Sequence, residues 1–479
     1  MSYVEALLVA DARKQGYGVR SALVRHRGLA RRPLGLLFWQ LGAEPFTAAA
    51  VAWGFGPKDC QVVAPGEPRD RELAFRELTK VAHAFNAWFE GPRDEPPQIV
   101  LANRGNLTLM GRLGRRLAFL PTDGDDPADP ELVRFGRHLL FLAKRARFPG
   151  QQLVIVLTEL MSSHWITELS KLEAQNLPAL EAAIAPPKGK TGHAAAFDVE
   201  NDPERIEVGP LPGAKDDTKV GALLTVFNQK RAASGVRSTD EAVVGPLRRP
   251  IEQHYRRLVG RGWPLLWRCL ERERGFVEAR SVPVRWEKDI EALNRHTEWI
   301  QKTGGRVRTR QTSAQAAYSL HGYEDAQKQL EAAEALDDRL RMLPYLESNQ
   351  ALGGRVVEVD LEHREQGTRN RVKRQRVTIE TEDRCTIVVG KELYWTETPN
   401  AAPYEIETVE PLSRGSRVVL KHTTGRAPEY PDDGADVIFS IHHGPEGFML
   451  MLPRAVPWTH TPNEDAEDES LEEPTEVWE

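Results

Sequence analysis

The sequence predicts a multidomain protein of class α/β plus all-β, and three observations lead to this prediction. At 479 residues the chain is longer than one ordinary core can organise, so two to four domains are expected. Apolar runs alternate with helical periodicity over residues 32–184, which is typical of a mixed α/β domain. Alternation with period two over residues 355–460 predicts a small C-terminal antiparallel β-barrel.

The N-terminal part, residues 1–184, is expected to hold three strands, a helix, a fourth strand and three further helices. Gly54, Gly56 and Pro57 mark the turn between the second and third strands, and Gly91 with Pro92 ends the first helix. In chain order the expected elements span 33–42, 46–56, 60–66, 69–91, 96–103, about 106–120, 131–147 and 166–184. This order of elements predicts a mixed sheet covered by helices.

Composition divides the rest of the chain into four parts. Residues 185–247 are rich in Pro, Gly, Lys and Asp and contain one convincing helical stretch at 220–233, so a linker or extended segment is expected. Residues 248–352 read as helical, and residues 353–460 read as the short strands of the barrel. Residues 461–479 are too acidic to bury and are expected to be a disordered tail.

Charge and cysteine usage narrow the protein class. The net charge of −6 depends on the nine acids of residues 463–479, without which the rest of the chain would carry +3. A mildly basic body favours contact with polyanions, although solubility alone also explains an acidic tail. Cys60, Cys269 and Cys385 are too far apart for a disulfide framework or a zinc site. A cytoplasmic protein with no membrane partner is expected, because neither a secretory signal nor a long apolar span is evident.

Gly189-Lys190-Thr191 matches the end of a phosphate-binding loop, G-x-x-x-x-G-K-[ST]. The first glycine of that pattern is replaced by Ile184, and the preceding residues read as a helix ending in prolines. A phosphate loop instead follows a strand and opens a helix. We therefore expect no nucleotide site here, and no cofactor.

The stretch LLFWQLGAEPF, residues 36–46, resembles the first strand of the RecB-type nuclease domains that are fused to superfamily-one helicases. The resemblance covers 33–120 and implies an RNase H-like fold for the N-terminal domain. Glu44 matches the end of the family pattern, but Gln40 and Gly42 stand where the resemblance implies metal-binding acids. Because two-metal hydrolysis needs several converging carboxylates, the domain is expected to be degenerate, with no catalytic residue and no metal.

The C-terminal part, 355–460, resembles the β-barrels associated with superfamily-one helicases. Six cations follow its first expected strand and are expected to bind the phosphates of nucleic acid: Arg364, Arg369, Arg371, Lys373, Arg374 and Arg376. The alternative is a solvated hairpin that Glu362, Glu365 and Glu380 partly neutralise. A shorter cluster of the same kind is formed by Arg306, Arg308 and Arg310.

These features favour a non-catalytic subunit that contacts nucleic acid, expected to be DNA, beside a separately encoded helicase or nuclease in DNA repair or anti-phage defence. Trp478 is the expected anchor for a partner or a base. A second hypothesis is a divergent Mg²⁺-dependent nuclease with Glu44, Glu72 and Glu77 as ligands. A third is a protein–protein scaffold without affinity for nucleic acid.

Overall fold

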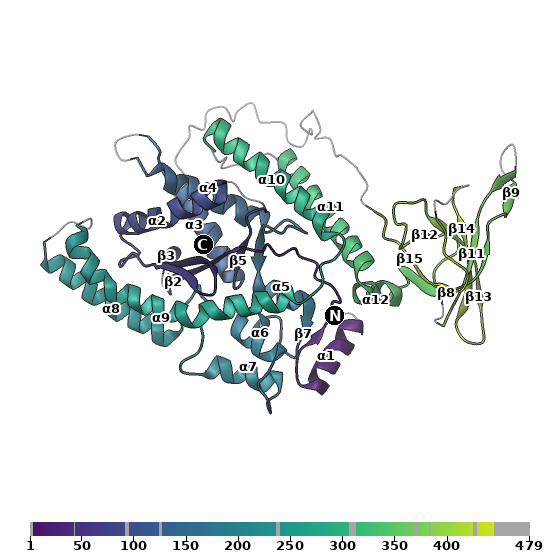
Figure 1. Cartoon of the computed structure of the whole chain (residues 1–479), viewed down its shortest axis with the longest axis horizontal. Helices are drawn as coiled ribbons and strands as arrows, with labels where there is room; N and C mark the ends of the chain where they lie inside the picture. Colours follow the sequence, from purple (N-terminus) through teal and green to yellow (C-terminus); the bar gives the residue numbers. More distant parts are fainter. Residues whose placement is uncertain are drawn as a thin grey trace, which may run out of the picture.

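The chain folds as a mixed α/β protein with a helix-covered sheet in its N-terminal part and an antiparallel sheet in its C-terminal part (Figure 1). The computed structural model describes residues 3–42, 44–91, 95–123, 127–235, 240–305, 313–366, 371–382, 385–424 and 429–444. The prediction of a mixed α/β fold with a separate all-β part is confirmed at this level.

The N-terminal sheet, within the described residues, has five strands in the order β4-β3-β2-β5-β6. They are β2 (Leu34–Leu41), β3 (Glu44–Gly56), β4 (Asp59–Val63), β5 (Ile99–Leu101) and β6 (Val154–Val156). The first three pair antiparallel, whereas β5 is parallel to both β2 and β6. The four strands expected from the sequence are confirmed, and β6 was missed.

Both faces of this sheet are buried, which explains why β2 is apolar along its length except at Gln40. One face of β2, with Leu36 and Phe38, packs against α2 (Arg71–Glu90), α3 (Arg104–Ala118) and α4 (Pro130–Arg145). The opposite face, with Leu37 and Trp39, packs against α9 (Glu241–Arg274) through residues such as Trp263. Figure 1 shows α2–α4 on one side of the sheet and α9 on the other.

The linker expected at 185–247 is wrong, because this segment is part of the N-terminal core. It contains α7 (Gly192–Asn201) and α8 (Ala214–Ala233), and α9 already begins at Glu241. Five of its apolar side chains are buried in the cluster that covers the sheet: Val208, Val220, Leu224, Phe227 and Val244. Its polar composition reflects an exposed outer side of α8 and not an absence of structure.

Smaller corrections concern the first 184 residues. The helix expected at 166–184 is limited to α6 (Leu177–Ile184), preceded by β7 (Trp165–Ile166) and the short 3₁₀ turn η1 (Glu173–Gln175). The sequence reading missed α1 (Tyr3–Gln15), β1 (Val19–Arg20), which pairs with β7, and α5 (Leu157–His164).

The helical region expected at 248–352 is confirmed for its described residues. After α9 it contains α10 (Val282–Thr303), α11 (Ser313–Asp337) and α12 (Arg339–Glu347). None of the helices in the described ranges combines the length and the apolar character that crossing a bilayer requires.

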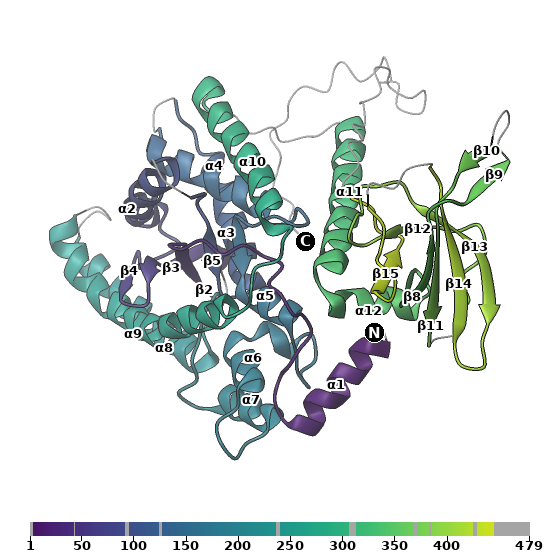
Figure 2. The same cartoon turned by 45° about the vertical axis from the view of Figure 1, so that its right-hand side comes forward.

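The C-terminal sheet closes on itself, because β8 pairs with both β15 and β11. Its described strands are β8 (Ala351–Asp360), β11 (Arg376–Thr381), β12 (Glu392–Trp395), β13 (Tyr404–Pro411), β14 (Ser416–His422) and β15 (Asp436–Ser440). Alternate residues such as Val377, Ile379 and Phe439 fill the interior, as a period of two requires. The end of the expected barrel region, residues 445–460, lies outside the described residues. Figure 2 shows the strands together with a hairpin, β9 (Arg364–Gln366) and β10 (Arg371–Lys373), that projects from them.

Asp338 joins the N-terminal segment to the helix that leads into the barrel. It caps α12 by accepting a hydrogen bond from the Leu340 N–H, and it also accepts from the Leu23 and Val24 N–H groups at 2.6 and 3.3 Å. His26 Nε2 lies 3.3 Å from the same carboxylate, which is buried. Burial alone would raise the pKa of Asp338, but these hydrogen bonds outweigh burial and hold the pKa below its usual 3.8.

We expect Asp338→Asn to lower the free energy of unfolding at pH 7 by about 1–3 kcal/mol. Because the folded-state pKa is depressed, the carboxylate contributes its full stability above the unfolded pKa and loses it as the pH falls through the folded pKa. The difference between wild type and variant should therefore shrink below about pH 4. Denaturant titrations at pH 7 and pH 3 measure it, and equal stability at pH 7 would contradict this role.

Candidate functional site

The edge of the sheet where β2 and β5 end is the place where the resemblance implies a metal site. The two strands are parallel, so their carboxyl ends meet at one edge. Gln40, at that end of β2, is buried, and its backbone N–H donates to the Pro210 carbonyl at 2.8 Å. The Gly42 N–H donates to Asp217 Oδ1 at 3.3 Å. Both positions thus contact the segment from residue 206 onward.

Residues 206–211, which we call the strap, cover this edge. Asn103, which caps α3, donates from Nδ2 to the Gly209 carbonyl at 2.8 Å. Asn106 donates from Nδ2 to the Val208 carbonyl at 2.9 Å and accepts from the Phe38 N–H at 2.7 Å. The side-chain amides of Asn103 and Asn106 bind backbone here, whereas a divalent cation prefers carboxylates. The carboxylates nearby have other partners, because Asp217 accepts from the Gly42 N–H and Glu207 pairs with Arg205. The strap therefore occupies the edge at which the resemblance implies a metal site.

The acids of the nuclease hypothesis do not form a ligand set in the described structure. Glu72 is exposed in the first turn of α2, whereas Glu77 is buried in the same helix. Five residues of helix separate them, or about 140° around the axis. Glu44 is the first residue of β3, and its side chain is not part of the described structure. Within the described ranges no group of three His, Cys, Asp or Glu side chains is placed to hold a metal.

Glu77 instead binds cations. Its carboxylate accepts from Arg248 and Lys80, each at 2.8 Å, and Arg248 is itself buried. Arg248 also donates to Glu241 at 2.8 Å, so the group ties α2 to α9 across the protein. This arrangement indicates a structural role for Glu77.

We expect Glu77→Ala to lower the free energy of unfolding by about 3 kcal/mol, because it leaves Arg248 buried with one partner fewer. Glu72→Ala, at an exposed position on the same helix, is the matched control and should cost less than about 1 kcal/mol. Denaturant titration of both variants measures the difference. If the two variants are equally stable and Glu77→Ala alone loses a Mg²⁺-dependent cleavage of DNA, Glu77 would instead be a metal ligand.

Gly189-Lys190-Thr191 starts helix α7 but is not part of a strand–loop–helix unit. Helix α6 precedes it, Thr191 Oγ1 accepts from the Ala194 N–H as an N-cap, and Lys190 pairs with Asp198. The Gly192 N–H donates to the Gly16 carbonyl at 2.7 Å. The described contacts of the tripeptide are therefore those of a helix cap.

The hairpin of β9 and β10 carries the cations expected to bind nucleic acid. Arg364 and Arg371 are exposed on it, and Lys373, Arg374 and Arg376 are partly exposed. Figure 1 shows the hairpin at the end of the barrel far from the N-terminal sheet. The other residues expected to bind nucleic acid or a partner lie outside the described residues: Arg306, Arg308, Arg310, Arg369 and Trp478.

The acids expected to neutralise this hairpin do so only in part. Glu362 accepts from Lys373 at 2.8 Å, and this hydrogen bond lowers the pKa of Glu362. Glu365 lies 3.3 Å from Lys421 and Glu380 lies 2.6 Å from Arg417, so both pair with cations of β14.

The remaining cations of this region differ in how far they are compensated. Arg376 pairs with Glu407 of β13. Arg371 and Arg374 form no ion pair with any described residue. In the hairpin register Arg364 lies directly opposite Lys373, and like charges in that position destabilise a strand pair. An anion bound here would relieve that repulsion.

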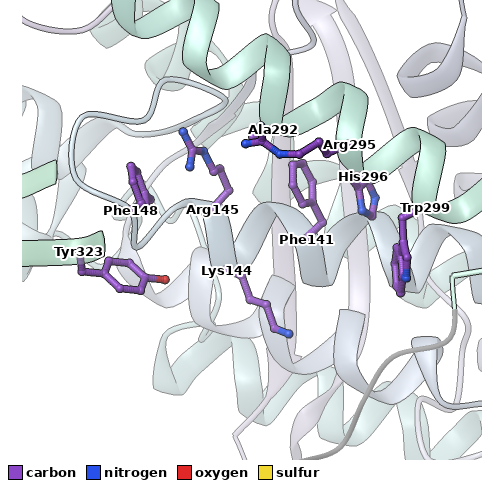
Figure 3. A pocket seen from close by; sticks show the side chains of 9 residues that line it. All are labelled: Phe141, Lys144, Arg145, Phe148, Ala292, Arg295, His296, Trp299 and Tyr323. Atoms are coloured by element: carbon purple, nitrogen blue, oxygen red, sulfur yellow. The ribbon is translucent and has the colours of Figure 1, made fainter. Parts of the chain in front are cut away.

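A groove between α4, α10 and α11 was missed by the sequence reading. It measures about 390 Å³ and is lined by Phe141, Lys144, Arg145, Phe148, Ala292, Arg295, His296, Trp299 and Tyr323. Figure 3 shows Phe148 and Tyr323 at one end and Trp299 at the other, with Phe141 and Lys144 between them. The sequence does carry one signal: cations lie three or four residues from aromatic residues on two helices, which places each pair on one helix face.

Comparison with known proteins yields no relative: no family model matches the chain, and neither does any curated protein or solved structure. The protein is therefore classified by its architecture and by its basic hairpin. It is a mixed α/β domain whose sheet edge is covered by its own chain, followed by an antiparallel barrel with a projecting basic hairpin.

Proposed function

We propose that this protein is a non-catalytic subunit that contacts nucleic acid, specifically DNA, through the phosphate groups. The observation that carries the proposal is the hairpin of β9 and β10, where Arg371 and Arg374 lack an ion pair with any described residue and Arg364 lies opposite Lys373. Arg364 and Lys373 are like charges in facing positions, which Glu362 offsets in part through Lys373, and a polyanion would stabilise the hairpin further. Arginine and lysine outnumber the other polar side chains of the hairpin that could read bases, such as Gln366, which suits phosphate contacts.

The N-terminal domain is proposed to be RNase H-like and degenerate. Support comes from its connectivity, in which three antiparallel strands are followed by a helix and by two strands parallel to the first. Further support comes from the sheet edge, where Gln40, Asn103 and Asn106 hold the strap in place of metal ions. The domain would then serve as a scaffold.

A separately encoded helicase or nuclease is the proposed partner, within DNA repair or anti-phage defence in the cytoplasm. This part of the proposal rests on the resemblance of residues 33–120 and 355–460 to domains that accompany superfamily-one helicases. A chain that holds nucleic acid without cutting it is useful when a second protein acts on the same strand.

The test is to incubate the purified full-length protein with end-labelled DNA and Mg²⁺ or Mn²⁺ and to record binding and cleavage together. The proposal expects DNA that is bound and uncut. Cleavage that Glu77→Ala or Glu72→Ala abolishes would favour the divergent nuclease. Absence of DNA binding at low salt would favour the third hypothesis, a protein–protein scaffold without affinity for nucleic acid.

A further inference from the structure

The groove between α4, α10 and α11 presents aromatic rings that are only partly covered. Phe141 stacks on His296 with ring centroids 4.1 Å apart and an interplanar angle of 7°. Phe148 and Tyr323 have centroids 5.5 Å apart, and Trp299 lies 5.8 Å from the His296 ring. The rings of Phe141, Phe148, Trp299 and Tyr323 are partly exposed, and they line an opening of about 390 Å³. Supported, partly exposed rings are suited to stacking against a flat aromatic ligand.

The charge of this groove is positive. Lys144, Arg145 and Arg295 line it, and no carboxylate of a described residue does. Arg145 donates to the buried Asp289 at 2.8 Å and lies over the Phe148 ring, so it holds the wall in place. Arg295 approaches Glu291 only at 3.8 Å on the exposed helix surface, and Lys144 forms no ion pair with any described residue. Lys144 and Arg295 are thus the cations available to an anion.

His296 contributes a ring and no charge. Burial, followed by the neighbouring His138, lowers the pKa of His296 to about 3, so its imidazole is neutral above about pH 4. The charge of the groove at neutral pH therefore comes from lysine and arginine alone.

We infer that this groove binds single-stranded nucleic acid, with a base stacked on Tyr323 or Trp299 and its phosphates at Lys144 and Arg295. The inference rests on the proposed function and adds to it a preference for strands with exposed bases. Aromatic platforms beside a cationic track are how proteins hold single strands without reading sequence. A duplex buries its base faces and offers the groove only its phosphates.

The experiment measures the affinity of the full-length protein for a labelled oligothymidine and for a duplex of the same length. Lys144→Glu/Arg295→Glu should weaken single-strand binding by about ten-fold or more, and Tyr323→Ala by about five-fold or more. Tyr323→Phe keeps the ring and should restore binding. The charge-matched control is Lys171→Glu/Lys188→Glu, at exposed positions outside the groove, and it should stay within about three-fold of wild type.

Two outcomes overturn the inference in distinguishable ways. If wild type binds the oligomer and the groove variants bind it equally well, the groove is not the site, while the proposed function stands. If wild type binds neither oligomer nor duplex at low salt, the proposed function fails as well. Unfolding curves for each variant separate loss of binding from loss of fold.

Discussion

Replacing Arg371, Lys373 and Arg374 together by Glu is expected to weaken DNA binding by roughly ten- to a hundred-fold at low salt and to flatten its salt dependence. Each phosphate contact contributes about 0.9 to the slope of log K against log salt, so losing three should reduce the slope by roughly 2 to 3. Single and double strands should be affected alike, because the hairpin is proposed to bind phosphates. Fluorescence anisotropy at several salt concentrations measures both quantities.

The matched control for this variant is Lys171→Glu/Lys188→Glu/Lys219→Glu, which makes the same charge change at three exposed positions of the N-terminal domain. Its affinity should remain within about three-fold of wild type. A hairpin variant that binds DNA as the control does would mean that the hairpin is only a solvated part of the barrel. Partial neutralisation by Glu362 and Glu407 would then suffice to explain its composition.

Gly209→Ala is expected to lower the free energy of unfolding by about 2–5 kcal/mol, because it combines two costs. Gly209 has φ +70°, a conformation that alanine adopts only with strain, and an added Cβ would lie 2.1 Å from the Phe38 carbonyl oxygen. The strap would have to move away from β2 to make room. Thermal or denaturant unfolding measures the loss.

Gly189→Ala is the matched control, since Gly189 also has a positive φ, +86°, but an added Cβ would meet nothing within 4 Å. Its cost should be the backbone strain alone, about 1 kcal/mol. Equal losses for the two variants would mean that the strap is not held tightly against the sheet edge. The proposal that the strap covers the sheet edge, and that the metal site expected there is degenerate, would then lose its support.

Local signals predicted the first half of the N-terminal sheet. Apolar runs bounded by Gly54, Gly56 and Pro57 define β2, β3 and β4, and an apolar stripe at helical spacing defines α2. Strand β6 was missed because α5 begins directly after it at Leu157, with no turn residue or capping side chain between them. A strand and a helix that share one apolar run cannot be separated by period.

Long-range packing explains the error over 185–247. Glycine and proline in that segment predict a loop, and the strap is indeed irregular, but Gly209 and Pro210 serve a close approach to β2 and α3. Val208 is buried by elements more than fifty residues away along the chain. The amino-acid composition of such a segment predicts that it is irregular, but it does not predict against which elements the segment packs.

The candidate sites were predictable to different degrees, because some of them depend on long-range packing and others do not. The cations at 364–376 are evident from the sequence, whereas the pairing of Glu365 with Lys421 and of Glu380 with Arg417 depends on the order of strands in the barrel. The groove brings together three helices, α4, α10 and α11, whose juxtaposition no local pattern specifies.

The most direct test of the proposed function is the affinity of the unmodified full-length protein for labelled single-stranded DNA across about 50 to 200 mM salt. The account predicts measurable binding at the lowest salt, with log K falling linearly against log salt with a slope of at least about −2 to −3, as three or more phosphate contacts require. Absence of binding at the lowest salt, or an affinity independent of salt, would contradict it.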